Sequence, residues 1–179
     1  MSNFPEKIKI ETERLILTPL ILADIPEFYG YRALPQVYKY QTWYPKDLPD
    51  AEQFITRYSL NRQVETGHWL QLGIYLKPKQ ELIGDSGFLL IKKEQAEIGY
   101  TISPKFQKQG FATESTRALV QYLFNDLGID LIIARTDPAN FGSIRILQKL
   151  KFCEEGLLKQ SIQIRGKWCD DLKFSLKKF

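Results

Sequence analysis

The amino-acid sequence predicts a single α+β domain built on one sheet, and three observations support this. Segments with the two-residue hydrophobic period of strands and segments with the helical period follow one another in the order β-α-α-β-β-β-α-β-α-β-β. Of the 179 residues, 44% are hydrophobic and 26% charged, as in an ordinary globular protein. The chain has no internal repeat, low-complexity tract or linker, so residues 1–179 are expected to form one domain.

The first element is expected to be extended. Apolar residues alternate with polar ones over residues 7–19, which is typical of a strand. Asp24, followed by Pro26, then gives a helix-start signal with apolar residues behind it. The chain therefore opens with a strand and a helix.

A loop rich in Pro, Tyr and Trp is expected over residues 35–49. Asp50 and Gln53 after it form a capping box, which predicts the start of a second helix. The apolar face of that helix continues toward Gly67.

Three strands and a long helix are expected in the middle of the chain. The strands are expected over residues 69–76, 82–91 and 96–102, because apolar and polar residues alternate there. Apolar residues at helical spacing then run over residues 111–127, and Gly128 stands where a C-cap glycine belongs.

The last third of the chain predicts three more strands around a short helix. Residues 131–134 form a continuous apolar run, typical of a strand buried on both faces. Asn140 is expected to cap the helix that follows it. Two closing strands are expected over residues 152–164 and 171–176, joined by a turn at residues 165–167.

Composition limits the classes of function. The net charge is +4, which suits an anionic ligand but falls short of the concentrated basic face of a nucleic-acid binder. The chain has one histidine and two cysteines, Cys153 and Cys169, without the clustering of a zinc site, and we expect two unpaired thiols. The first seven residues do not form a signal peptide, and no stretch approaches the roughly 20 apolar residues of a membrane span, so a cytoplasmic protein is expected.

The segment from residue 97 to residue 113 carries the chemistry. A strand runs through a short loop directly into a long amphipathic helix, whose free N–H groups and dipole favour an anion. Gly110 leaves room for a phosphate to approach the main chain, and Lys105 and Lys108 add positive charge. These residues predict an anion site at a helix N-terminus.

Three motifs give this segment a family resemblance. Gln107-x-x-Gly110-x-Ala112 resembles the acyl-coenzyme-A signature of the GNAT superfamily. The opening Thr12-Glu13-Arg14-Leu15-Ile16-Leu17 and the later Asn140-x-x-Ser143-x-x-x-Leu147-x-Lys149-Leu150-x-Phe152 resemble the branch of ribosomal-protein-alanine N-acetyltransferases. The motifs stand in the family's order and cover nearly the whole chain.

The resemblance implies a GNAT-type α+β fold, whose mixed, mostly antiparallel central sheet has splayed middle strands and about four flanking helices. It implies acetyl-coenzyme A as co-substrate, no metal, and direct attack of a primary amine, either a protein N-terminus or a small molecule, in a ternary complex. It also implies a set of coenzyme-binding positions, namely Thr101, Ile102, Gln107, Lys108, Gln109, Gly110, Phe111, Ala112, Thr113, Asn140 and Ser143.

Two catalytic roles follow from the resemblance. Glu97 is the candidate general base, or else a structural hydrogen-bond acceptor. Ser143 is the candidate partner of the leaving thiolate, or else a second helix cap. His68 is expected to start a strand rather than act as a base.

Several positions leave questions open. Lys151 stands where the family has glycine, and Leu147 where many relatives have a tyrosine that protonates the thiolate. The aromatic residues of the loop could line an acceptor pocket or belong to the core; they are Tyr38, Tyr40, Trp43 and Tyr44.

Other functions fit less well. A GNAT-fold protein that binds acyl-coenzyme A without catalysis stays open, because Leu147 cannot donate a proton. A nucleic-acid-binding module lacks its aromatic strand motif, and a serine hydrolase lacks the Gly-x-Ser-x-Gly elbow. The expected partners are acetyl-coenzyme A and an amine, without membrane or nucleic acid, for a monomer or homodimer.

Overall fold

A computed structural model describes residues 8–60 and 63–178 of the chain. Their strands form one sheet in the order β1-β2-β3-β4-β5-β6-β8-β7. All neighbours pair antiparallel except β5 and β6, which are parallel. The strands are β1 (Ile10–Glu11), β2 (Leu15–Pro19), β3 (Trp69–Leu76), β4 (Glu81–Lys92), β5 (Gln95–Ile102), β6 (Leu131–Thr136), β7 (Cys153–Ile164) and β8 (Lys167–Lys177). The predicted α+β fold with a mixed, mostly antiparallel sheet is confirmed.

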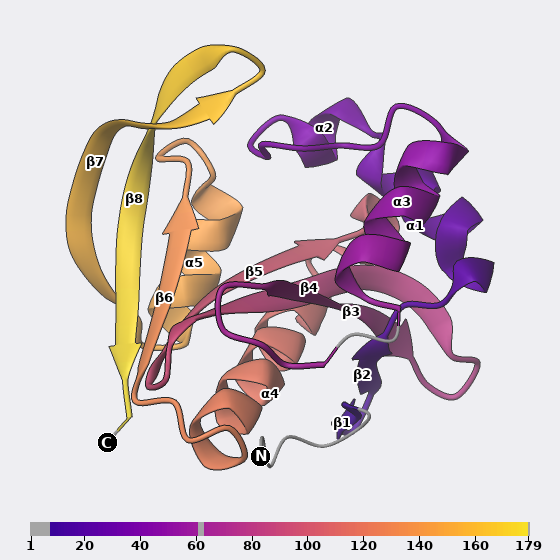
Figure 1. Ribbon diagram of the computed structural model, residues 1–179, viewed down its shortest axis with the longest axis horizontal. Helices are drawn as coiled ribbons and strands as arrows, with labels where there is room; N and C mark the ends of the chain where they lie inside the picture. The colour runs from indigo at the N-terminus through magenta and orange to yellow at the C-terminus, as the bar shows by residue number, and fades with distance from the viewer. Residues whose placement is uncertain (1–7, 61–62, 179) are drawn as a thin grey trace.

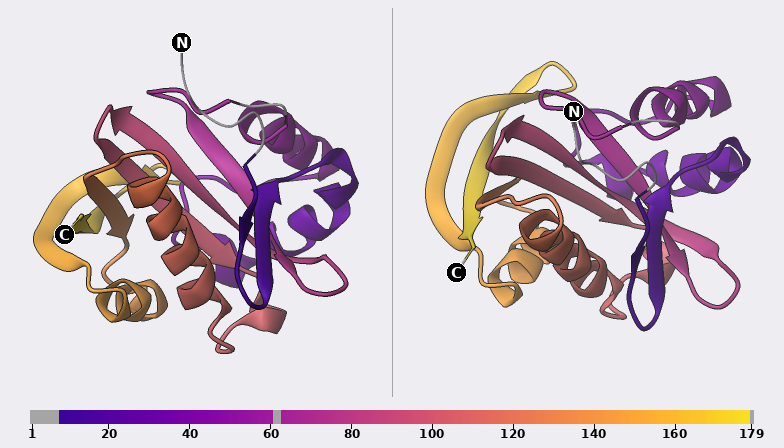
Figure 2. Two further views of the ribbon diagram at one scale, coloured as in Figure 1. Left: turned by 90° about the horizontal axis from the view of Figure 1, so that it is seen from below. Right: turned by 60° about the horizontal axis from the view of Figure 1, so that its bottom comes forward.

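Helices cover both faces of this sheet (Figures 1 and 2). Three lie on one face, namely α1 (Ile25–Arg32), α2 (Pro35–Tyr38) and α3 (Leu48–Tyr58), and two on the other, α4 (Phe111–Asn125) and α5 (Phe141–Lys149). The larger apolar cluster lies between the sheet and α4 and α5; its fully buried members include Phe88, Leu119, Leu123, Ile132, Leu147 and Phe174. A smaller cluster under α1 and α3 contains Phe28 and Ile55. The side chains of each strand therefore belong alternately to the α1–α3 face and to the α4–α5 face.

The two parallel strands separate before they end. The last pair between β5 and β6 is Ile98 with Ala134, whereas β5 stays paired with β4 as far as Ile102. Residues 99–102 of β5 therefore have no partner on β6. We call the space beside them the β5–β6 opening. The predicted splay of the middle strands is confirmed, and the sheet has an opening at its centre.

Two predictions near the N-terminus are wrong in detail. The expected strand over residues 7–19 is a hairpin, because the Thr12 hydroxyl accepts a hydrogen bond from Leu15 N (2.9 Å) and turns the chain. Residue 7 and the segment before it, for which no signal peptide is expected, lie outside the described residues. The expected loop over residues 35–49 contains the short helix α2.

The cap of α3 lies one turn earlier than predicted. Asp47, in an extended conformation, accepts the hydrogen bond from Asp50 N (2.9 Å), and Pro49 fits the first turn, where its missing N–H costs nothing. The helix ends at Tyr58 and does not continue toward Gly67. The Ser59 hydroxyl bonds instead to Leu20 N and Gln71 O, both at 2.6 Å, and ties the chain to the sheet.

Other boundaries move by a few residues. The closing hairpin starts β8 at Lys167 rather than at residue 171, because its turn contains only Arg165 and Gly166. Gly128 has the positive φ (+67°) expected after α4. Lys151, in the family's glycine position, also adopts a positive φ (+66°), at a cost of about 1–2 kcal/mol. The turn that ends α5 thus keeps the glycine geometry without the glycine.

Candidate active site

A cavity of about 660 Å³ lies at the β5–β6 opening. Side chains from both faces of the sheet line it. Glu97, Gly99 and Thr101 of β5 belong to the α1–α3 face, while Tyr100 belongs to the α4–α5 face. Helix α5 contributes Asn140 and Ser143. The cavity thus brings together residues from opposite sides of the sheet.

The predicted anion-binding loop has left-handed backbone at two positions. Gly110, the N-cap of α4, has φ +87°, and Lys108 has φ +62°. Gln107 Nε2 donates to the carbonyl of Ile102 (2.9 Å), which ties the loop to the end of β5. The first backbone bond of α4 runs from Glu114 N to the Gly110 carbonyl (3.0 Å), so the N–H groups of residues 111–113 precede the helical bonds. These N–H groups lie where the sequence predicts an anion site.

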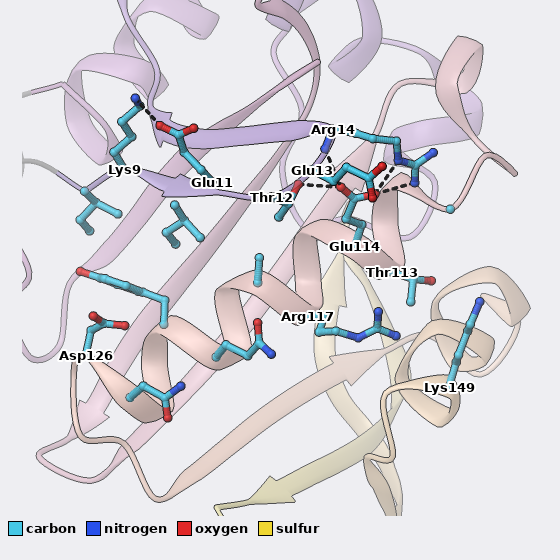
Figure 3. A pocket seen from close by; sticks show the side chains of 17 residues that line it. Lys9, Glu11, Thr12, Glu13, Arg14, Thr113, Glu114, Arg117, Asp126 and Lys149 are labelled. Atoms are coloured by element: carbon cyan, nitrogen blue, oxygen red, sulfur yellow. Dashed lines mark hydrogen bonds and ion pairs between the residues drawn. The ribbon is translucent and has the colours of Figure 1, made fainter. Parts of the chain in front are cut away.

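The loop is held from the N-terminal hairpin (Figure 3). The Glu114 carboxylate accepts hydrogen bonds from the Thr12 hydroxyl (2.6 Å) and from Arg14 Nε (2.7 Å). Arg14 also donates to the carbonyl of Gln109 (3.2 Å), and its guanidinium lies 4.4 Å from the centre of the Phe111 ring. Burial raises the pKa of Glu114, but the hydrogen bonds from Thr12 and Arg14 outweigh it, and the pKa lies below its ordinary value. The opening motif thus fixes the loop that begins α4.

Figure 3 also shows a second cavity, of about 910 Å³, between β1, the β1–β2 turn and α4. Arg117 of α4 and Lys149 of α5 line it together with the Arg14–Glu114 pair. The sequence around Glu114 indicates no role for this residue. Its partners are about 100 positions away, so no local pattern could have revealed them.

On the α4–α5 face, Ser143 lies next to Tyr100, a residue that no sequence motif marks as functional. The Tyr100 hydroxyl lies 3.0 Å from Ser143 Oγ. Asn140 caps α5 by accepting a bond from Ser143 N (3.3 Å), so the Ser143 hydroxyl is left to Tyr100. Burial raises the pKa of Tyr100 to about 12, although the hydrogen bond with Ser143 opposes the rise. Tyr100 therefore keeps its proton at neutral pH, whereas Leu147 is buried in the core.

The α1–α3 face of the cavity carries carboxylates. Glu97 of β5 lies 3.9 Å from Arg135 Nε, and burial raises the pKa of Glu97; Arg135 opposes this shift and the charge of Asp171 adds to it. Asp171 of β8 lines the same cavity. Burial also raises the pKa of Asp171; the charge of Arg135 opposes this shift, and the charge of Asp137 adds to it. These groups place proton acceptors on the side opposite Ser143.

A buried ion pair supports the same face. Arg32 of α1 donates through Nε to Asp85 of β4 (2.9 Å), and Tyr31 donates to the same carboxylate (2.6 Å). Arg32 also donates to the amide oxygen of Gln41, whose Nε2 in turn donates to the hydroxyl of Thr101 (2.9 Å). Burial lowers the pKa of Arg32, but Asp85 outweighs it, so the pKa is raised. The network links the loop after α2 to the unpaired end of β5.

The aromatic loop divides between two roles. Tyr40 and Trp43 line the cavity, and Trp43 stacks on Phe54 of α3 at 4.4 Å. Tyr38 and Tyr44 stack on each other at 4.1 Å outside it. The tip of the β7–β8 hairpin reaches this loop, since Arg165 donates to the carbonyls of residues 38 and 39.

The single histidine and the two cysteines do not line this cavity. His68 is exposed just before β3, as expected. Cys153 and Cys169 are both free thiols. Within residues 8–60 and 63–178, no group of three or more His, Cys, Asp or Glu side chains is placed to hold a metal ion. Over the same residues no helix combines the length and the apolarity needed to cross a bilayer.

Known proteins share this fold and sequence. The family profile described as "Acetyltransferase (GNAT) domain" matches residues 14–153. The chain is 35% identical over 173 residues to the N-acetyltransferase p20 of Bacillus licheniformis, covering 93% of this chain and 94% of that protein. It is 28% identical over 120 residues to the ribosomal protein uS5-alanine N-acetyltransferase of Escherichia coli, covering 65% of this chain and 62% of that protein. A crystal structure of a GNAT-family acetyltransferase from Bacillus anthracis has the same fold, with a TM-score of 0.85 and 23% identity over 95% of this chain and 98% of that one.

The profile covers most of the chain, and it includes the anion-binding loop and both sides of the β5–β6 opening. With the family, the predicted enzyme class is confirmed as well: an N-acetyltransferase with acetyl-coenzyme A as co-substrate. From its fold, its motifs and its relatives, this protein belongs to the GNAT family of acetyltransferases.

Proposed function

We propose that the protein transfers the acetyl group of acetyl-coenzyme A to a positively charged primary amine, by direct attack in a ternary complex. The observation that carries the proposal is the cavity at the β5–β6 opening, which has Tyr100 and Ser143 on one side and carboxylates on the other. Donor and acceptor can therefore approach the same point from opposite faces of the sheet.

The donor would lie along β5. Its pantetheine arm is a chain of amides and can pair with the free edge at Thr101 and Ile102 like an added strand. Its pyrophosphate would rest on the N–H groups of the loop, at Gln107, Lys108, Gln109, Gly110, Phe111, Ala112 and Thr113. Phe111 is buried beneath Arg14, so we assign it a contact through its backbone.

The chemistry needs three further groups. The N–H groups near Thr101 would hold the thioester oxygen as it becomes negative. A carboxylate on the α1–α3 face would take the proton of the amine, and Glu97 is the one that the sequence predicts. The leaving thiolate would be protonated from the Ser143–Tyr100 pair, which fills the role that Leu147 cannot.

Turnover of acetyl-coenzyme A with a panel of amines tests this proposal. The panel contains a peptide with an N-terminal alanine, a polyamine, a free amino acid and an aminoglycoside, and mass spectrometry detects the acetylated product. Acetyl-coenzyme A at 100 times its dissociation constant should also stabilise the fold by roughly 2.7 kcal/mol. Binding and stabilisation without product from any amine would favour a non-catalytic acyl-coenzyme-A-binding protein, and the absence of binding would contradict the donor site itself.

Ser143→Ala is expected to lower turnover of acetyl-coenzyme A while affinity for coenzyme A changes little, because the hydroxyl acts on the leaving thiolate. The defect should shrink with an acetyl thioester of a more acidic thiol, which departs without help. The rate of acetyl transfer by the variant and by the wild-type protein is measured with each of the two thioesters. Tyr100→Phe is the matched variant, since it removes the partner hydroxyl but leaves Ser143. An equal loss with both thioesters would restrict Ser143 to a structural role.

A further inference from the structure

One buried carboxylate in the cavity lacks the partners that buried carboxylates normally have. Asp171 of β8 is only 4% exposed, and it lines the cavity. Its Oδ2 atom has no hydrogen-bond partner within the described part of the chain. Buried polar atoms are almost always paired, so an unpaired carboxylate oxygen at a cavity wall calls for a ligand.

Asp85 shows what a structural carboxylate looks like in this protein. It is fully buried, and its two oxygens accept hydrogen bonds from Tyr31, Arg32 and Gln71. No ion pair or hydrogen bond of this kind holds the Asp171 carboxylate among the residues that the structure describes. The Asp171 carboxylate therefore differs from that of Asp85 in having an oxygen free to bind a ligand.

The strand register places Asp171 beside the reactive end of β5. Strands β5 and β6 pair last at Ile98 and Ala134, and β6 pairs with β8 at Thr136 and Leu172. Continued past these last pairs, the register would bring Asp171, one position beyond Leu172, level with position 101 of β5, and both residues line the same cavity. By the same count Glu97, which pairs with Ile133, lies four positions back. Asp171 is the carboxylate at the level of Thr101.

The side chain also belongs to the acceptor side of the sheet. Arg135 pairs with Lys173, and Ile133 pairs with both Glu97 and Ser175, so alternation assigns Asp171 to the same face as Glu97. Thr101 shares that face. Ser143 and Tyr100, the groups proposed for the thiolate, lie on the other.

We propose that Asp171 binds the ammonium group of the acceptor and takes its proton. The inference rests on the proposed function and adds to it the residue that receives the amine. One N–H bond of R–NH₃⁺ breaks and its proton passes to the Asp171 carboxylate. The freed electron pair of nitrogen forms the bond to the thioester carbon, and the C–S bond then breaks. The Ser143–Tyr100 pair protonates the thiolate, the second proton that nitrogen loses restores that pair, and Asp171 returns the first proton to solvent.

The surroundings make Asp171 a stronger proton acceptor than an ordinary aspartate. Burial and the neighbouring Asp137 raise the pKa of Asp171, while Arg135 limits the rise. The charge of Asp171 in turn raises the pKa of Glu97. The charged and titratable groups that line the same cavity are Arg32, Tyr40, Arg57, Tyr58, Glu97, Tyr100, Arg135 and Asp137, and Cys169 and Lys173 share the strand and face of Asp171.

The test compares Asp171→Asn with Glu97→Gln on the best amine of the panel. Asp171→Asn should lower kcat/KM at pH 7 by about 10²–10⁴-fold, with unchanged affinity for acetyl-coenzyme A. Wild-type kcat/KM should rise with pH as the carboxylate loses its proton. The variant should lose this rise and gain rate only as the amine itself becomes neutral, so its deficit shrinks at high pH. Glu97→Gln should keep the rise, since the carboxylate of Asp171 is still present.

Three results would overturn the inference. Asp171→Asn with wild-type kcat/KM at pH 7 would remove Asp171 from the reaction. A pH-independent deficit with weakened coenzyme binding would make Asp171 structural. If Glu97→Gln lost the rise of kcat/KM with pH and Asp171→Asn kept it, Glu97 would be the base. Failure of the proposed function looks different, since the wild-type protein would then acetylate no amine of the panel.

Discussion

Gly110→Val is expected to abolish binding of acetyl-coenzyme A while the protein stays folded. Gly110 has φ +87°, a conformation that a β-branched residue adopts only with strain. A Cβ there would also come within 3.4 Å of Arg14 Nη2, and its branches would occupy the proposed phosphate site. The strain costs about 1–3 kcal/mol, less than the stability of a typical domain. Titration calorimetry should show no heat where the wild-type protein saturates.

Gly128→Val is the matched control. Gly128 has a positive φ (+67°) at the other end of α4, with open space where a Cβ would be added. The Gly128→Val protein should have similar backbone strain and keep the wild-type affinity for acetyl-coenzyme A. If Gly110→Val binds with unaltered affinity, the pyrophosphate site lies elsewhere.

Asp85→Asn is expected to destabilise the fold by about 3–5 kcal/mol, because it leaves the buried Arg32 without its counter-charge. Arg32 and Asp85 are both nearly inaccessible to solvent, so water cannot replace the lost partner. Urea unfolding followed by circular dichroism measures the loss as a lower midpoint at constant slope. The link from Arg32 through Gln41 to Thr101 should loosen as well.

Glu65→Gln provides the comparison for an exposed pair. Glu65 and His68 lie 3.5 Å apart with more than half of each side chain exposed, and such pairs contribute little to stability. The unfolding midpoint of this variant should stay near that of the wild-type protein. An Asp85→Asn protein as stable as Glu65→Gln would mean that Arg32 finds another partner and that the ion pair does not anchor α1.

Much of the fold could be predicted because its signals are local. Alternation alone predicted the bounds of β3, and helical spacing predicted α4 to within two residues of its end. The loop at the start of α4 could be predicted because its strand, glycine and helix follow one another within the 17 residues from 97 to 113. Errors arose where local signals compete. Asp47 and Asp50 are both of a residue type that caps helices, but in the structure only Asp47 is the cap of α3, and Asp50 lies in the first turn.

The sequence by itself thus determined the family, the α+β class, most of the strands and helices, and the cap at Asn140. The tertiary structure alone decided which side chains meet at the centre of the sheet. Tyr100 and Ser143 are 43 positions apart, and Arg14 and Glu114 are 100 apart. Asp171 becomes notable only because β8 pairs with β6 in one register, which puts its carboxylate level with Thr101. Periodicity and caps are properties of neighbouring residues, whereas strand register is fixed by hydrogen bonds and packing between distant ones.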